Sequence, residues 1–273
     1  LLRPARGGSE GHTGSCRNRR ASTTTGKGRM ALRDTIRDLT RSHLDAGYSV
    51  MGQTLSAVGN VGNTVPDHPG ILELPCSDVS NAGVAVGHAL AGKRPIYIIR
   101  YQGFSAFNHA LIVSYAAKSK EMWGKPCPML VRGVAMEGKI GPVAGGSHHG
   151  LFNAPGVRMY SPMTSEEWRT AYDEFMAGDD VVYLSEHRGS WGEDWDESSL
   201  HRTNPDCVLF PISITRAAAL KAALARNAAC YPIWRLRPLV TSPAALDALR
   251  RCGRGLVIDD AHTPFAKAVA HDL

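Results

Sequence analysis

The sequence lacks several features that would place it in a common class of protein. No apolar run approaches the roughly 20 residues of a membrane-spanning helix, and no apolar signal-peptide pattern occurs. There is no P-loop and no G-x-G-x-x-G motif. The six cysteines are scattered, without a C-x-x-C pair or the spacing of zinc ligands. These absences predict an intracellular protein with reduced cysteines and no membrane segment.

Net charge is absent from most of the chain, although the formal total is +6. Residues 1–29 hold seven of the 31 Lys and Arg residues and only one of the 25 acids, Glu10, so residues 30–273 carry 24 of each sign. The basic character therefore belongs to the N-terminal segment. It predicts no nucleic-acid-binding surface on the folded part.

Residues 1–29 are rich in Gly, Ser, Thr and Arg and have few apolar residues to pack, so we expect disorder. Two interpretations remain open. The segment is either sequence translated upstream of a start at Met30 or an organelle transit peptide that is rich in Arg and Ser. The lack of an amphipathic stripe favours the first, which predicts a cytoplasmic protein. The second predicts an organelle matrix.

From Met30 onward, helical and strand-like patterns alternate. Helical spacing of apolar residues begins at Leu32 and predicts a helix that stops near Gly47. Short apolar runs predict strands at 71–74, 95–99, 129–134, 157–160 and 181–184. Helical patterns lie between them at 81–91, 104–123 and 165–176. This alternation predicts an α/β fold with a mostly parallel sheet covered by helices.

A polar segment at 186–206, broken by Gly and Pro, indicates a linker. A smaller α/β pattern follows it, with strands expected at 208–212, 231–236 and 256–259 and helices at 216–226 and 243–251. We therefore expect one domain at 30–190, a linker at 191–205 and a second, smaller domain at 206–273. The brevity of the second pattern suggests an incomplete domain.

The most informative run extends from Glu73 to Lys118. It reads ELPCSDVSNAGVAVGHALAG and then KRPIYIIRYQGFSAFNHALIVSYAAK. In order, it contains an acidic residue, G-x-x-x-G, an R-P-I strand, a phenylalanine and A-A-K. Four further motifs follow, namely P-x-x-x-R-G at 128–133, P-G-V-x-x-x-S-P at 155–162, ISITRAAALKAALA and RGLVIDD. Together these motifs resemble the β subunit of the decarboxylating component of 2-oxo acid dehydrogenases. More broadly, they resemble the pyrimidine-binding domain of the transketolase superfamily.

The resemblance implies thiamine diphosphate as cofactor. In the family, a glutamate bonds to the far nitrogen of the aminopyrimidine ring and shifts the ring's tautomer. The aminopyrimidine then removes the proton from C2 of the thiazolium ring, which gives the reactive carbanion. The matching residue here is Asp78, whose side chain is about 1.5 Å shorter, one C–C bond. Asp is also a favoured N-cap, so capping a helix that begins at Ser80 is an alternative role for Asp78.

Aromatic residues follow the predicted strand at 95–99. The resemblance implies that Phe104 stacks on the pyrimidine ring and that Tyr101 lines the same pocket. Taken alone, Phe104 at the start of a helix also fits ordinary core packing.

Two adjacent histidines end a loop that has five glycines between 138 and 150. The resemblance implies that one of them faces the reacting centre, where an imidazole can hold or donate a proton. Alignment on Phe152 selects His148, but the loop is longer than the family's, so His149 stays a candidate. A solvated pair is the alternative. A zinc site built from Cys76, His148 and His149 is a further alternative, which rests on the residue types alone.

No G-D-G sequence, which holds Mg²⁺ and the diphosphate in thiamine enzymes, occurs in the chain. The resemblance therefore implies an α-type partner subunit that supplies this site, in a heterotetramer. The expected function is that of a β-type subunit that decarboxylates a 2-oxo acid or transfers a two-carbon or acyl unit from a 2-oxo acid or ketose. The alternatives are the C-terminal subunit of a split transketolase and a degenerate regulatory subunit. Asp78 in place of glutamate supports the last, whereas Phe104 and the two histidines oppose it.

Overall fold

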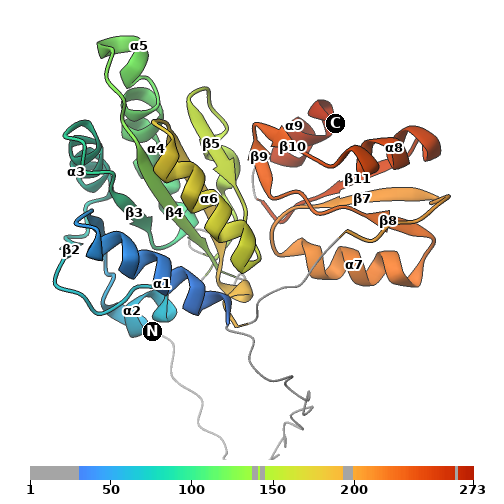
Figure 1. Ribbon diagram of the computed structural model, residues 1–273, viewed down its shortest axis with the longest axis horizontal. Helices are drawn as coiled ribbons and strands as arrows, with labels where there is room; N and C mark the ends of the chain where they lie inside the picture. The colour runs from blue at the N-terminus through green and yellow to red at the C-terminus, as the bar shows by residue number, and fades with distance from the viewer. Residues whose placement is uncertain (1–30, 137–140, 142–144, 193–198, 262–263) are drawn as a thin grey trace, which may run out of the picture.

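The computed structural model describes residues 31–136, 141, 145–192, 199–261 and 264–273, so the predicted disorder of residues 1–29 lies outside it. In these ranges the strands form an eight-stranded sheet in the order β10-β9-β5-β6-β4-β3-β1-β2 and a three-stranded sheet in the order β11-β7-β8 (Figure 1). Helices cover both sheets. The predicted α/β fold with a mostly parallel sheet is confirmed.

Six neighbouring strands of the large sheet are parallel: β2 (Ile71–Leu74), β1 (Val50–Gln53), β3 (Ile96–Ile99), β4 (Met129–Ala135), β6 (Val181–His187) and β5 (Val157–Tyr160). The antiparallel strands β9 (Arg235–Arg237) and β10 (Leu239–Val240) extend the sheet beyond β5. Strands β3, β4 and β6 are buried along their whole length, as the near-continuous apolar runs of a parallel sheet require.

Helices α1 (Leu32–Asp45) and α6 (Ser165–Ala177) pack on one face of the large sheet, and α3 (Asp78–Leu90) and α4 (Ser105–Leu111) pack on the other (Figure 1). After α4 the chain continues through a π-helix, Ile112–Ala116, and the short α5 (Ser119–Trp123). A capping box between Thr164 and Glu167 starts α6. None of the helices in the described ranges has both the length and the apolar character of a membrane span.

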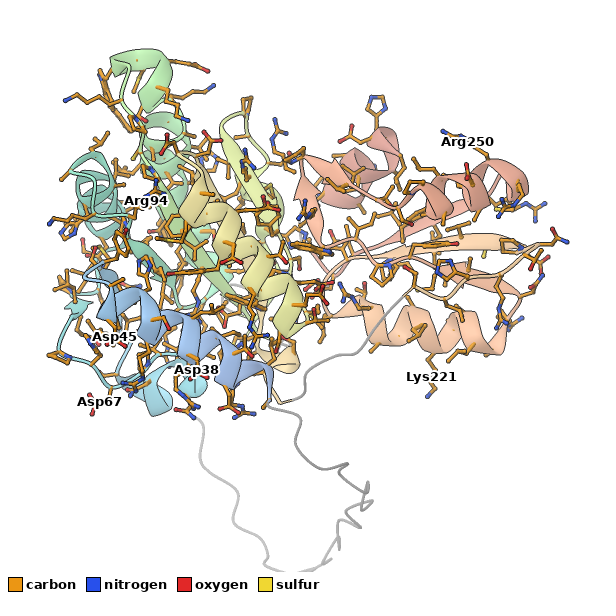
Figure 2. The ribbon with its side chains drawn as sticks, in the orientation of Figure 1. Asp38, Asp45, Asp67, Arg94, Lys221 and Arg250 are labelled. Atoms are coloured by element: carbon orange, nitrogen blue, oxygen red, sulfur yellow. The ribbon has the colours of Figure 1, made fainter. Side chains whose placement is uncertain are left out.

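The small sheet contains β7 (Cys207–Pro211), β8 (Ala228–Cys230) and β11 (Gly255–Ile258). Helix α7 (Thr215–Ala225) covers one face, and α8 (Pro243–Cys252) and α9 (Phe265–Asp272) lie on the other side. Lys221 of α7 and Arg250 of α8 point away from this sheet in opposite directions (Figure 2).

One apolar cluster joins the small sheet to the large one, since Phe210, Leu236 and Phe265 belong to the same cluster as Phe152. Strand β9, which lies beyond the expected linker, also pairs with β5. The division into two domains at 30–190 and 206–273 therefore stays a prediction. The two parts share one core.

Two predicted elements are wrong. The single helix expected over 104–123 is a 3₁₀ turn at Gln102–Phe104, then α4, a π-helix and α5. The strand expected over 231–236 is replaced by β8 and β9, which belong to different sheets. In the second segment, pairing of β8 with β7 and of β9 with β5 overrides the local apolar pattern.

The sequence reading also missed β1, α2 (Ala57–Asn63) and α9. Strand β1 has only two apolar residues, and it includes Gly52, where a Cβ atom would lie 2.6 Å from the carbonyl oxygen of Ile98. A backbone approach this close requires glycine. Periodicity cannot detect such a strand.

A buried ion pair links the two central strands. Arg132 on β4 donates hydrogen bonds from Nε and Nη2 to the Glu186 carboxylate on β6, each 2.9 Å long, and both side chains are 1% exposed. Nη2 also donates to Thr64 Oγ1 at 2.9 Å, and the guanidinium lies 5.6 Å from the Trp168 ring centre. Because both charges are desolvated, each needs the other.

We therefore expect Glu186→Ala to lower the free energy of unfolding by about 3–5 kcal/mol, because it leaves Arg132 buried without a counter-charge. Urea unfolding followed by circular dichroism measures the loss. Asp247→Ala is the matched control. It breaks the exposed pair of Asp247 with Arg250, and we expect a cost under about 1 kcal/mol. Equal losses in the two variants would contradict the expectation.

Candidate functional site

The carboxylate of Asp78, the first residue of α3, is held by two amide side chains. Gln53 Nε2 at the end of β1 donates to both carboxylate oxygens at 3.2 Å, and Asn108 Nδ2 on α4 donates to Oδ1 at 3.0 Å. The N-cap of α3 is Ser77, so the N-cap role for Asp78 is wrong. The carboxylate instead bonds to side chains of β1 and α4.

Asn108 connects Asp78 to the aromatic segment. Its Nδ2 also donates to the carbonyl oxygen of Phe104 at 2.9 Å, and its Oδ1 accepts a 2.6 Å hydrogen bond from the Tyr97 hydroxyl. Burial, and then the charge of Asp78, raises the pKa of Tyr97 above its usual range, so the phenol stays a donor. The network therefore directs its donors toward Asp78, which remains the acceptor.

Gln53 adds an unsatisfied acceptor next to this carboxylate. Its Oε1 is buried and has no hydrogen-bond partner among the described residues. A buried acceptor without a donor is costly. The pair of Asp78 and Gln53 can therefore accept hydrogen bonds from a ligand with N–H groups.

The rings of Tyr101 and Phe104 meet edge to face, with centres 5.8 Å apart. Phe104 packs partly against the core but is not fully buried, and the exposed Phe107 lies 6.3 Å from it, centre to centre. A ring that is half in the core and half open is fixed in orientation and still has surface for a ligand. The structure thus brings Asp78 and Phe104 together through Asn108.

His148 is positioned through its backbone. Its amide N donates to Gln102 Oε1 at 2.7 Å. Gln102 is fully buried, and its Nε2 donates to the carbonyl oxygen of Gly133 at 2.9 Å and to Ser185 Oγ at 2.8 Å. Gln102 therefore attaches His148 to the carboxyl ends of β4 and β6 and to the segment that carries Tyr101 and Phe104.

His149 has different surroundings. It is fully buried between Asp259 Oδ2, 3.1 Å from Nε2, and Ser185 Oγ, 3.2 Å from Nδ1. A carboxylate only accepts, so Nε2 carries the proton and Nδ1 accepts from Ser185. These residue types match a Ser-His-Asp triad, but all three side chains are at most 3% exposed, which leaves no access for a substrate. The arrangement ties the loop to the C-terminal segment.

A second histidine–aspartate pair lies beside the first. His187 Nε2 donates to Asp260 Oδ2 at 3.1 Å, and Ser147 Oγ donates to the same oxygen at 2.8 Å. Burial alone would raise the pKa of Asp260, but the hydrogen bonds from His187 and Ser147 and the nearby His149 lower it overall. Asp259 and Asp260 thus hold the C-terminal segment against the end of the large sheet.

Several of these residues were not found from the sequence. Gln102 and Asn108 lie two residues before and four residues after Phe104, a spacing that signals polar anchors around an aromatic residue. Gln53 ends the strand that was missed. Asp259 and Asp260 end the RGLVIDD motif, but the sequence assigned them no role. Cys76 is exposed, and no group of three or more potential metal ligands occurs in the described part of the chain.

No protein-family model matches the chain. It is 25% identical over 239 residues to the β subunit of acetoin:2,6-dichlorophenolindophenol oxidoreductase from Cupriavidus necator, covering 80% of this chain and 68% of that one. It is 31% identical over 129 residues to the β subunit of the human mitochondrial pyruvate dehydrogenase E1 component, covering 45% and 35%. The match thus spans about a third of the human relative.

Among solved structures, the chain resembles one described as a split gene transketolase, inactive beta4 tetramer, with a TM-score of 0.67 and 14% identity over 90% of this chain and 85% of that one. This likeness shows the fold. The comparisons confirm the predicted resemblance to β subunits of this superfamily.

Because the pKa of Asp260 is lowered in the folded state, its charge stabilises the protein above the ordinary pKa of 3.8, and this stability is lost as the pH falls through the lower folded value. We expect Asp260→Asn to cost about 1–3 kcal/mol at pH 7 and progressively less below about pH 4. Urea unfolding over this pH range measures the difference. The exposed Asp272→Asn is the control, and a cost that grows on acidification would contradict the expectation.

Proposed function

We propose that the chain is the β-type subunit of a thiamine-diphosphate-dependent enzyme that decarboxylates a 2-oxo acid or transfers a two-carbon or acyl unit. The observation that carries the proposal is the Asp78 carboxylate, which Gln53 and Asn108 hold next to Phe104. This carboxylate stands where the resemblance requires the acid that binds the pyrimidine ring.

The residues present fit an aminopyrimidine. Asp78 would bond to the ring nitrogen, the unsatisfied Gln53 Oε1 offers an acceptor for an N–H group, and Phe104 offers a ring for stacking. Tyr101 supports Phe104 edge-on. When bound, thiamine diphosphate supplies the carbanion that attacks a substrate carbonyl. The task of this chain is to orient the ring and hold the proton at Asp78.

The shorter acid fits this arrangement. Asp78 is the first residue of α3, and its carboxylate is fixed from two sides by Gln53 and Asn108, so the side chain has a defined direction despite its length. Glutamate at this position would push one methylene further into the same amides. These contacts support a site that works with aspartate.

His148 is the histidine that we assign to the reacting centre, where its imidazole would hold or donate a proton to substrate oxygens. Gln102 fixes its backbone to the segment of Tyr101 and Phe104. We assign His149 a positioning role, since its ring is enclosed between Ser185 and Asp259.

The partner that we propose is an α-type subunit carrying a G-D-G sequence, which would hold Mg²⁺ and the diphosphate in a heterotetramer. A second candidate function is the C-terminal subunit of a split transketolase, favoured by the fold shared with a protein of that description. Product analysis with a 2-oxo acid and with a ketose phosphate separates the two functions. A regulatory subunit would give no product with either.

We expect the chain alone to bind thiamine diphosphate weakly, with a dissociation constant above about 100 μM, because it offers the pyrimidine contacts but no diphosphate site. Addition of a partner with G-D-G should bring the constant to the micromolar range or below. Isothermal calorimetry with Mg²⁺, with and without the partner, makes the measurement. Micromolar binding by the chain alone would overturn the two-subunit proposal.

In the complex, we expect Asp78→Asn to slow C2 proton exchange of the bound cofactor by more than about 100-fold, because an amide keeps the shape but cannot transfer the proton. Exchange measured by NMR gives the rate, and assembly should be unchanged. Asp38→Asn, on the exposed face of α1, is the control (Figure 2).

Asp78→Glu is the companion variant. If the site is built for the shorter side chain, the extra methylene displaces Gln53 or Asn108 and the exchange rate falls. A higher exchange rate in Asp78→Glu would show instead that aspartate activates the cofactor less well than the family's glutamate does. Full exchange in Asp78→Asn would end the catalytic assignment.

A further inference from the structure

A pocket of about 100 Å³ lies at the carboxyl ends of β3, β4 and β6. Ligands of open parallel sheets bind at this edge. The pocket combines two basic side chains with apolar ones, and none of its described lining residues is acidic. The lining residues include Val61, Arg100, Val134, Met136, Arg188 and Trp191.

Arg100 is the unusual member of this pocket. Its side chain is only 8% exposed, yet no carboxylate forms an ion pair with it in the described part of the chain. Its guanidinium donates from Nη1 to the carbonyl oxygens of Thr54 and Ala57 and lies 5.6 Å from the Tyr101 ring centre. Carbonyl dipoles satisfy a donor but do not neutralise a charge.

Other buried arginines are paired. Arg132 has the Glu186 carboxylate, and Arg216, which is fully buried, has Glu167 Oε1 at 3.0 Å. A desolvated cation requires an opposite charge. No carboxylate of the described residues meets this requirement for Arg100, and an anion that enters the pocket would meet it. Both hydrogen bonds that it makes to described residues use Nη1, so Nη2 and Nε are available for such an anion.

The backbone over the pocket supplies an independent observation. Residues 59–63 of α2 all have φ between +52° and +66°, which is rare outside glycine. One of them is Val61, a β-branched residue in the pocket wall. At Gly62, a Cβ atom would come within 2.3 Å of the Trp191 ring. Conformations of this kind persist where a binding site requires them.

We propose that this pocket binds the anionic group of a small organic acid, a carboxylate or a phosphate, carried on a short apolar body. Arg100 supplies the buried charge. Arg188, which is exposed, supplies a second charge at the rim. Val61, Val134 and Trp191 contact the apolar part. Tyr101 lies between this pocket and Phe104, so the ligand sits beside the site of Asp78.

The binding site does not depend on the proposed function, because it requires neither cofactor nor partner. The full chain is titrated by calorimetry with pyruvate, with 3-methyl-2-oxobutanoate and with glycerol 3-phosphate. Binding of the oxo acids identifies a carboxylate site, and binding of glycerol 3-phosphate alone identifies a phosphate site. Either result supports the proposal.

We expect Arg100→Gln to weaken binding by at least about ten-fold, since it removes a buried charged donor. Arg188→Glu, at an exposed position, should also weaken it by about ten-fold through charge reversal. Arg250→Glu, distant on α8, is the control and should leave the affinity unchanged (Figure 2).

Two results would overturn the proposal. One is no detectable binding of any of the three acids at millimolar concentration. The other is an affinity that Arg100→Gln or Arg188→Glu leaves unchanged. Failure of thiamine diphosphate to bind the complex would contradict the proposed function, but it would not affect the proposal that the Arg100 pocket binds an anion.

Discussion

The candidate site depends on one buried side-chain amide, that of Gln102. Its three hydrogen bonds reach the carbonyl of Gly133 on β4, the hydroxyl of Ser185 on β6 and the backbone of His148. A buried amide with every partner in place can adopt only one orientation. It therefore fixes the distance between the histidine loop and the sheet, and through Ser185 and His149 it also fixes the position of Asp259.

The surroundings of Asp78 are also held by side-chain hydrogen bonds, which start from the neighbouring strands β1 and β3. The Tyr97 hydroxyl donates to Asn108 and Asn108 donates to Asp78, so this chain of hydrogen bonds ends at a carboxylate. Gln53 leaves one acceptor unsatisfied at the end of this chain. Among the described residues, Gln53 Oε1 has no donor and Arg100 has no carboxylate partner, and both lie at the carboxyl edge of the large sheet.

The sequence predicted the elements that have local signals. Apolar runs gave β3 to β6 closely, and helical spacing gave α1 and α6. The motif match named Asp78 and Phe104, and in the structure Asn108 links the side chain of Asp78 to the backbone carbonyl of Phe104. The rest required distant partners. The burial of His149 involves a hydrogen bond to Asp259, 110 residues away, and β1 depends on a close backbone contact at Gly52. Neither constraint is visible in a local window.

The pairing of β9 with β5 has a consequence for how the chain reaches this fold. Strand β5 (Val157–Tyr160) is synthesised before β9, with which its outer edge pairs in the described structure, and β10 in turn pairs with β9. Until those residues emerge, an open strand edge can pair with another chain. Once they emerge, β9 pairs with the edge of β5 and removes this site for pairing between chains.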